Sequence, residues 1–246
     1  MIELKGLPAS PGVAIGKVVI YKRRLDVIVA QDRHVSPSEE ISRLFKALEK
    51  TKEQILKLRE EVVKIVGEKE AAIFDAHLMI LEDKEFVDKV VNYIEEKTIS
   101  AEKAVKMVSE SIIEMFESMD NEYFRARADD IKDLVNRVLN NLADIKIVEL
   151  ELREPRIVAT SELYPSETVK MQRQKVIGII TEKGGITSHA AIIARAMRIP
   201  AVVGVNGLLQ VVKDGDLVIV DGSKGIVLVS PEEEIVEKYL NKVGER

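Results

Sequence analysis

Between residues 36 and 145 the apolar positions recur every three to four residues, which predicts amphipathic helices. The stretch SPSE offers Ser36 as an N-cap, Pro37 at the first helical position and Glu39 to close a capping box. Gly67 is expected to end this first helix. Its inward-facing stripe comprises Ile41, Leu44, Phe45, Leu48, Ile55, Leu58, Val62 and Val66.

Three more amphipathic segments follow in the same region. They lie at about 69–81 with a short continuation to about 96, at about 100–119, and at about 123–142. Because only short loops join these segments, they predict a helical bundle or two helical hairpins.

Both ends of the chain show the short apolar runs that are typical of β-strands. GKVVIYK and LDVIVA lie before the helical region, and RIVAT, KVIGIIT, AVVGV, DLVIVDG and GIVLVS follow it. One helix, beginning near Ser188, interrupts the later runs, and PEEEIVEKYLNKVGER predicts a final charged helix. We therefore expect an α/β domain of residues 1–33 plus 146–230, an inserted helical domain of residues 34–145, and a C-terminal linker helix at 231–246.

Composition narrows the classes of protein. The chain has 246 residues and no cysteine, which excludes a disulfide, a thiol nucleophile and a thiolate metal site. It has neither a run of 18 apolar residues nor a signal peptide, so we expect a cytoplasmic protein that does not span a membrane. Histidine and carboxylates do not cluster at metal-ligand spacing, so no metal site is predicted. Few aromatic residues together with many Glu and Lys hint at a thermophile.

Charge is unevenly distributed along the chain. Residues 36–145 hold 17 Lys and Arg against 25 Asp and Glu, a net charge of −8, whereas the remainder holds 20 against 17, a net charge of +3. An acidic region argues against a nucleic-acid partner and fits a basic protein partner. A solvated helical surface would show the same excess of acids, and this alternative stays open.

The stretch KVIGIITEKGGITSHAAIIARA predicts a strand, a glycine turn and a helix. Gly184 and Gly185 permit a tight turn, and the helix opens at about Thr187, Ser188 and His189. The unpaired N–H groups of a first helical turn favour an anion and a neutral imidazole, which is the nucleophilic form of histidine. A phosphoryl group on His189 would therefore lie beside these donors, with two hydroxyls close by in the sequence.

Other chemistries are disfavoured at this turn. It lacks the GxxxxGK[ST] phosphate loop of nucleotide-binding proteins and the GxSxG elbow of hydrolases. A single histidine at the start of a helix is nevertheless more often a cap or a structural hydrogen-bonding group. From the residues alone, both interpretations of His189 stay open.

The stretch GGITSHAAIIARAMRIPAVVG resembles the phosphohistidine signature of enzymes that use phosphoenolpyruvate. This group includes enzyme I of the bacterial sugar phosphotransferase system, phosphoenolpyruvate synthase, and pyruvate phosphate dikinase. The resemblance implies that His189 becomes phosphorylated, and Arg195 occupies the position of the motif's arginine. Together with Gly184, Gly185, Thr187 and Ser188, Arg195 is expected to shape the turn and the phosphate site.

Further segments resemble enzyme I more than its relatives. LPASPGVAIGKVVIY resembles its opening, AIFDAHLMILEDKEF its second-helix region, EYFRARADDIKDLVNRVL its RxxDxxD segment, and LYPSETVKM its PS[DE]T element. The sequence has LYPS where the family often shows LTPS, a modest departure. The implied fold is an α/β swivelling phosphohistidine domain with an inserted all-α subdomain of four helices in two hairpins.

The resemblance also implies a reaction and a partner. His189 would accept a phosphoryl group from phosphoenolpyruvate and pass it to a histidine of HPr, the small phosphocarrier protein of sugar uptake. The barrel that binds phosphoenolpyruvate and Mg²⁺ in enzyme I lies in a C-terminal half for which this sequence has no counterpart. We therefore expect a monomer that holds no cofactor of its own.

The family likeness assigns roles to individual residues. Thr168 matches the threonine whose hydroxyl hydrogen-bonds the active imidazole, although a hydroxyl that only caps a helix after Pro165 is an equal alternative. The residues expected at the HPr docking face are Glu68, His77, Glu82, Asp83, Glu85 and Arg127. Bland alternatives remain: His77 as a core residue, the acids as a solvated surface, and Arg127 as the partner of an i,i+3 ion pair with Asp130.

Two other functions remain possible. The chain could be the swivelling carrier domain of a dikinase or synthase, although the acidic helical insertion argues against this. It could also be a non-catalytic binding module in which His189 is structural.

Overall fold

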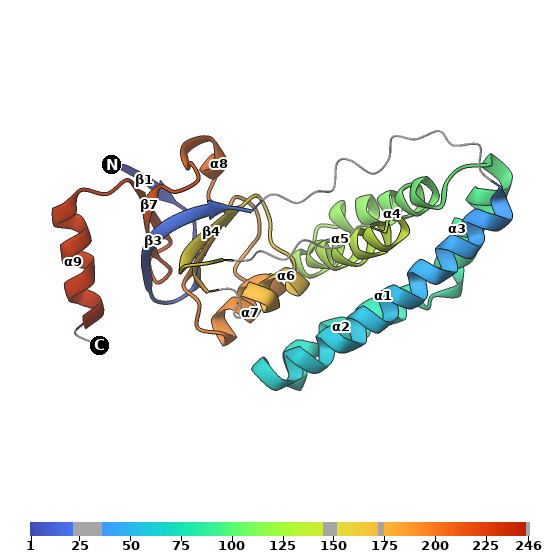
Figure 1. The fold of residues 1–246 in the computed structure, drawn as a ribbon, viewed down its shortest axis with the longest axis horizontal. Coiled ribbons are helices and arrows are strands. Elements are labelled where there is room, and N and C mark those ends of the chain that lie inside the picture. Colours follow the sequence, from blue (N-terminus) through green and yellow to red (C-terminus); the bar gives the residue numbers. More distant parts are fainter. Residues whose placement is uncertain (22–35, 145–151, 172–174, 245–246) are drawn as a thin grey trace. The chain divides into compact units, whose positions relative to one another are not determined.

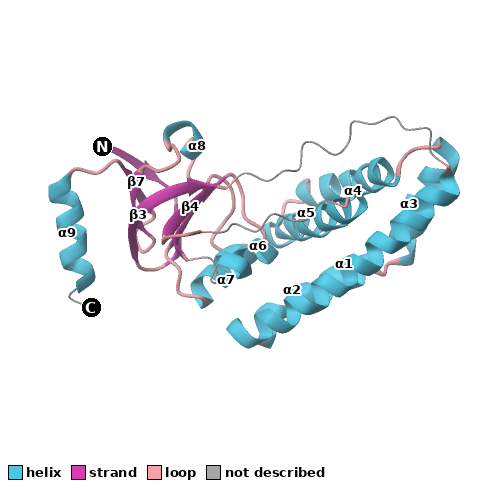
Figure 2. Cartoon of the chain, viewed as in Figure 1, coloured by secondary structure: helices cyan, strands magenta, loops and turns pink. Residues whose placement is uncertain are grey.

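The computed structural model describes residues 1–21, 36–144, 152–171 and 175–244. The chain divides into two compact units (Figure 1). One unit joins both ends of the chain, Met1–Arg23 and Glu149–Arg246, and the other is the intervening segment Arg24–Val148. Figure 2 shows that the described strands are confined to the first unit, whereas helices and their connecting loops make up the described part of the second.

The described strands of the first unit form a mixed sheet in the order β1-β8-β7-β3-β4-β5-β6-β2. Strands β3 to β6 run parallel to one another, and the remaining pairs are antiparallel. The strands are β1 (Ile2–Lys5), β2 (Leu7–Ser10), β3 (Val13–Ile20), β4 (Arg156–Thr160), β5 (Val176–Thr181), β6 (Ala201–Val203), β7 (Leu217–Asp221) and β8 (Ile226–Val229).

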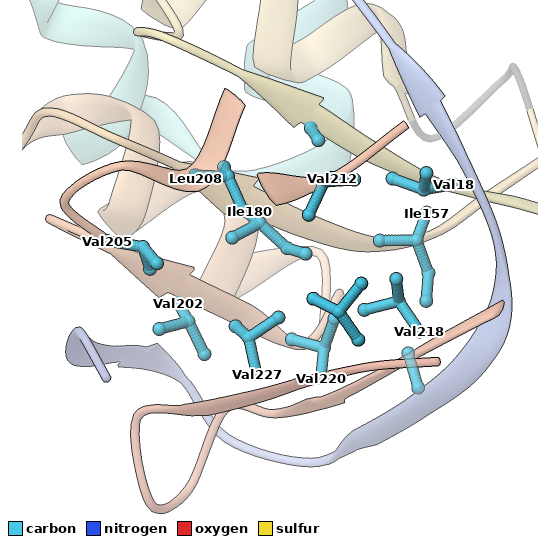
Figure 3. Packing of buried hydrophobic residues seen from close by; sticks show 13 residues of the cluster. Val18, Ile157, Ile180, Val202, Val205, Leu208, Val212, Val218, Val220 and Val227 are labelled. Carbon is cyan, nitrogen blue, oxygen red and sulfur yellow. The ribbon is translucent and has the colours of Figure 1, made fainter. Parts of the chain in front are cut away.

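Strand β3 joins the two parts of this sheet. Its first half, Val13–Lys17, pairs with β7, and its second half, Val18–Ile20, pairs with β4. Side chains from both parts meet in one apolar core, as Figure 3 shows for Val18, Ile157 and Val220. Because burial of a valine or isoleucine side chain contributes about 1.5–3 kcal/mol, this core is the main source of stability for the unit.

The described helices that accompany the sheet are α6 (Pro165–Met171), α7 (His189–Ala196), α8 (Leu208–Val211) and α9 (Glu233–Gly244). Helix α7 contacts α6, β2 and β6, and α9 contacts β3. Tyr239 on α9 hydrogen-bonds Asp221, which lies buried at the end of β7. Burial raises the pKa of Tyr239, and the negative charge of Asp221 raises it further.

The described helices of the second unit are α1 (Pro37–Val66), α2 (Glu68–Leu81), α3 (Lys84–Lys97), α4 (Ala101–Glu117) and α5 (Glu122–Leu142). Helices α1 and α2 pack closely, as do α4 and α5. Two ion pairs fix the antiparallel register of the first hairpin: Arg59 Nε lies 2.7 Å from Asp75 Oδ1, and Lys52 Nζ lies 2.7 Å from Glu82 Oε1. In each pair the two residues lie equally far in sequence from Gly67, where the chain turns between the two helices. The expected α/β domain with an inserted helical subdomain is confirmed, but α3 is a separate helix with its own N-cap, Asp83, so the described part of this unit has five helices and not four.

Arg43 joins three helices at one end of this unit. Its guanidinium donates to Glu40 on α1 (2.7 and 2.8 Å), to Glu102 on α4 (2.5 Å) and to the carbonyl of Leu142 on α5 (2.8 Å). Glu40 also accepts from the N–H of Ala101 (2.8 Å). Burial lowers the pKa of Arg43, but the hydrogen bonds to both carboxylates outweigh that effect and raise it above its ordinary value.

Several details differ from the sequence-based expectations. Ser36 is the N-cap of α1, but its hydroxyl contacts Ser38 Oγ (2.9 Å) rather than a helix N–H, so the predicted capping box is wrong. Phe45, expected inside, is 52% exposed. The short helix α6 begins at Pro165, where a helix was considered, whereas the short helix α8 was not predicted. The expected strand LDVIVA lies outside the described residues.

Replacing Arg43 tests the three-helix junction. Arg43→Met would leave the carboxylate of Glu40 buried without its cation, which is costly. Because the Arg43 side chain is 38% exposed, we expect a loss of about 2–3 kcal/mol, less than for a fully buried pair. Urea denaturation followed by far-ultraviolet circular dichroism measures this loss. Lys89→Met, which removes an exposed pair with Glu85, is the control and should leave the midpoint unchanged. Equal midpoints for the two variants would contradict the prediction.

Tyr239 predicts a pH dependence at α9. Its folded-state pKa is raised, so the protonated hydroxyl stabilises the docked helix below the ordinary tyrosine pKa of about 10. This contribution should be lost as the pH rises through the higher folded-state value. The difference in tyrosinate absorbance between the native chain and Tyr239→Phe reports the titration of this one residue. A difference curve centred at or below the ordinary value would refute the expectation.

Candidate functional site

The turn between β5 and α7 carries the candidate histidine. Strand β5 ends at Thr181, residues 182–188 form the turn, and His189 is the first residue of α7. Ser188 is the N-cap of α7: its backbone is extended, and its hydroxyl accepts from the N–H of Ala191 (3.2 Å). The backbone of His189 therefore lies at the helix start, as predicted, while its side chain lies outside the described residues.

The entry of the turn is held by the neighbouring strand β4. The N–H groups of Glu182 and Lys183 donate to the carbonyls of Thr160 (3.1 Å) and Ser161 (2.8 Å). The buried hydroxyl of Thr181 donates to the carbonyl of Lys183 (2.6 Å), which closes the turn on itself. These bonds leave the first part of the turn little freedom.

The middle of the turn requires glycine and then approaches the helix. Gly184 has φ +99°, a conformation that residues with a Cβ rarely adopt. The carbonyl of Gly185 accepts from the N–H of Ser188 (3.2 Å). The side chain of Thr187 is exposed. The predicted turn residues are thus brought together in one short segment.

Arg195 holds the exit of the turn. Its Nε and Nη2 both donate to the carbonyl of Ala9 on β2 (3.0 and 2.7 Å), and Nη2 also donates to the carbonyl of Ile186 (3.2 Å). The guanidinium thus joins the last turn of α7 to the preceding loop and to a strand from the start of the chain.

Thr168 lies on α6, which packs against α7. It is fully buried, and its hydroxyl donates to the carbonyl of Tyr164 (3.0 Å). Because the hydroxyl proton of Thr168 is used in this bond, its oxygen could interact with an imidazole only by accepting a hydrogen bond. This bond lies within α6 but does not cap the helix, because the hydroxyl donates to a carbonyl and does not accept from a helix N–H. The acceptor role towards the imidazole stays a prediction.

Two carboxylates near the site escaped the sequence analysis. Glu167 Oε2 accepts from the N–H of Tyr164 (2.9 Å) at the start of α6, and Oε1 accepts from the hydroxyl of Tyr21 (3.1 Å). Glu182 Oε1 accepts from the N–H of Leu209 in α8 (3.0 Å). A glutamate three residues after a helix start is a capping signal that could have identified Glu167. The partner of Glu182, the N–H of Leu209, is 27 residues away in sequence, so no local sequence pattern predicts this bond.

The predicted docking residues all lie in the helical unit, but they do not form one cluster there. Glu68 begins α2 and Glu82 follows its end, and a helix of 14 residues is about 21 Å long. Each acid already has a local partner: Glu68 pairs with Arg59 (3.0 Å), Glu82 with Lys52, and Glu85 with Lys89 (2.7 Å). The hydrogen bond with Glu82 raises the pKa of Lys52.

Asp83, His77 and Arg127 also have structural roles. Asp83 caps α3, because its carboxylate accepts from the N–H of Phe86 (2.9 Å). The expectation that His77 faces a partner does not fit the structure, since its side chain is 2% exposed and packs edge-on against Phe74. Its place on the inner face of α2 explains the difference. Arg127 Nη1 donates to the buried Asp130 (3.1 Å), the predicted i,i+3 pair.

Within the described residues, no group of three or more histidine or carboxylate side chains could hold a metal ion. None of the described helices is long and apolar enough to cross a bilayer.

Comparison with protein families gives two matches. Residues 5–127 match the family described as PEP-utilising enzyme, N-terminal, and residues 152–225 match the PEP-utilising enzyme, mobile domain. The second match contains the β5–α7 turn, and the first contains most of the helical unit.

Curated relatives match nearly the whole chain. Phosphoenolpyruvate-protein phosphotransferases are 40% identical to it in Priestia megaterium over 99% of the chain, and 40% identical in Bacillus subtilis over 98%. The relative from Haemophilus influenzae is 34% identical over 93% of the chain. The chain spans only 42%, 42% and 40% of the lengths of these relatives.

Solved structures agree with these matches. One is described as an NMR solution structure of Enzyme I (nEIt); it is 42% identical, with a TM-score of 0.76 and 98% coverage of both chains. Another, the N-terminal domain of Enzyme 1 - Nitrogen, is 28% identical with a TM-score of 0.61, and the match covers 98% of this chain and 99% of that one. The chain therefore belongs to the family of PEP-utilising enzymes, in which it corresponds to the N-terminal domain of enzyme I.

Proposed function

We propose that this chain is a phosphoryl-transfer domain that carries the phosphoryl group on His189. The observation that carries the proposal is the position of His189 as the first residue of α7, after a turn held by β4 and β2. Free N–H groups of a first helical turn stabilise negative charge, and a rigid turn positions a nucleophile for attack. Positioning and electrostatics supply most of the catalysis of phosphoryl transfer.

Each transfer replaces one bond to phosphorus by another. When phosphorylated HPr is the donor, the N–P bond of its histidine breaks as an N–P bond to His189 forms, and the same step runs in reverse. When phosphoenolpyruvate is the donor, its O–P bond breaks, and the enolate that leaves takes up a proton to become pyruvate. The second reaction belongs to the whole protein, whose further half would bind phosphoenolpyruvate and Mg²⁺.

Thr168 would orient the imidazole of His189. Its hydroxyl proton goes to Tyr164, so its oxygen would accept a hydrogen bond from one ring N–H. That bond would fix the tautomer and leave the other ring nitrogen with the lone pair that attacks phosphorus.

HPr is the proposed partner of the helical unit. Residues 36–145 carry a net charge of −8, which would attract a basic carrier and speed its encounter. Glu68, Glu82 and Glu85 are exposed and would contribute to this field even while they pair with lysine or arginine. Asp83 and Arg127 would add to the contacts with HPr from other parts of the helical unit.

The relatives favour enzyme I over a dikinase or a synthase, because phosphoenolpyruvate-protein phosphotransferases match both the helical insertion and the α/β unit. Cytoplasmic location and a monomeric state stay predictions. Fractionation of cells and sedimentation of the purified chain would test them.

Phosphate exchange with phosphorylated HPr tests the assignment of His189. The native chain should gain an acid-labile phosphate, His189→Ala should gain none, and His34→Ala should behave like the native chain. Phosphoenolpyruvate alone should not label residues 1–246, because they match only the N-terminal part of the relatives and the half proposed to bind phosphoenolpyruvate lies outside that part. If His189→Ala is labelled, His189 is not the carrier. If the native chain is never labelled, the non-catalytic alternative is correct.

Replacing the Thr168 hydroxyl separates its two roles. Thr168→Val should lose about 1 kcal/mol of stability with its hydrogen bond, and Thr168→Ser should keep both the bond and the exchange rate. Thr160→Val, which removes a similar bond to the carbonyl of Glu162, is the control for stability. If Thr168 orients the imidazole, Thr168→Val should slow exchange at least about tenfold, beyond the effect of the control. Equal exchange rates would leave Thr168 with a structural role in α6 only.

A further inference from the structure

We infer that Arg195 is a positioning residue: its guanidinium fixes the turn that carries His189 and does not serve as a ligand of the phosphoryl group. The inference rests on the proposed function of His189 and deepens it. The sequence motif marks the position of this arginine but leaves open whether it binds phosphate or shapes the turn.

The hydrogen bonds of Arg195 are directed at backbone oxygens. Nε and Nη2 form a fork on the single carbonyl of Ala9, and the second proton of Nη2 goes to the carbonyl of Ile186. A guanidinium has five N–H protons, and these three bonds use every proton on Nε and Nη2. The edge that would bind two phosphate oxygens in a bidentate manner through Nε and Nη2 is therefore already occupied.

The strand that accepts the fork is shaped for it. Strand β2 pairs with β6, and the register shifts between Pro8 and Ser10, around Ala9, as in a β-bulge. Such a shift turns a backbone carbonyl away from the regular ladder. Ala9 is 1% exposed, so its carbonyl needs a partner inside the protein, and the guanidinium is that partner.

The reach of the side chain explains why it meets the turn. Arg195 lies six residues after His189, about 9 Å along the helix axis. Side chains on a helix lean towards its N-terminus, so the guanidinium points back along α7. It meets the carbonyl of Ile186, three residues before His189, and thereby joins both sides of the helix start.

These hydrogen bonds predict how the rate of phosphoryl transfer changes when the guanidinium of Arg195 is removed. Loss of the fork would free Ile186 and the following residues, so His189 would attack phosphorus from a broader range of positions. Such misplacement lowers a rate by between about ten- and a hundredfold. Loss of the fork would not change the equilibrium constant for transfer of the phosphoryl group between HPr and His189, because no contact with the phosphoryl group is lost.

The test compares Arg195→Met, Arg195→Lys and the control Arg153→Met in the whole chain. Arg153 is an exposed arginine at the amino end of β4, whereas the turn follows the carboxyl end of β5. Three quantities are measured: the rate of exchange with phosphorylated HPr, the equilibrium constant of that exchange, and the amide resonances of Ile186, Thr187 and Ser188 in the unphosphorylated chain. Thermal unfolding checks that each variant is folded.

We expect Arg195→Met to slow exchange about ten- to a hundredfold, to shift or broaden the three amide resonances, and to leave the equilibrium constant unchanged. Arg195→Lys should recover part of the rate, because an ammonium can still donate to Ala9 but cannot form the planar fork. Arg153→Met should match the native chain in all three measurements. If Arg195→Met does not fold, Arg195→Lys carries the test.

Two results would overturn the inference. An equilibrium shift towards phosphorylated HPr, with the amide resonances unchanged, would show that Arg195 binds the phosphoryl group. If both Arg195 variants keep the native exchange rate and the native amide resonances, the hydrogen bonds of Arg195 do not position the turn. If the native chain takes up no phosphate, the proposed function fails, while the resonances still decide whether Arg195 holds the turn.

Discussion

The parallel pairing of β3 with β4 is the contact on which the organisation of the chain depends. Val18 pairs with Ile157, and the whole helical unit lies between them in sequence. Within the helical unit, Arg43 near the start of α1 binds the carbonyl of Leu142 at the end of α5, so the first and last described helices of this unit meet there.

The same principle of remote anchoring organises the candidate site. The turn after β5 is short, yet its backbone is bonded to Ser161 before α6 and, through Arg195, to Ala9 near the start of the chain. Its conformation is thus set by two segments that lie earlier in the chain, together with the helix that follows it. A nucleophile on such a turn is positioned before any partner arrives, so little free energy is spent on ordering it during the reaction.

The sequence predicted the elements that have strong local patterns. The stripe of α1, the glycine at its end and the apolar runs of β4, β5 and β7 follow from helical or strand periodicity and burial. It failed where the outcome depends on distant neighbours. Ser36 lost its capping role to a contact with Ser38, and Phe45 is exposed although it continues an apolar stripe.

At the site the same division holds. The sequence predicted the glycine turn and the helix that begins at His189, because a strand, a turn and a helix each have a local sequence pattern. The fork of Arg195 on Ala9 spans 186 residues and could not be read from either segment. His77 lies on a helix with a weak amphipathic pattern, so its inward direction was not evident from spacing.

The irregular strand β2 has a further consequence at the border of the sheet. Among the described strands it is last in the order, where an open row of backbone groups could recruit a strand from another molecule. Pro8 has no N–H to donate, the register shift at Ala9 breaks the regular spacing, and a guanidinium takes the carbonyl of Ala9. The feature that anchors the reactive turn thus also interrupts the regular row of backbone groups at this border of the sheet.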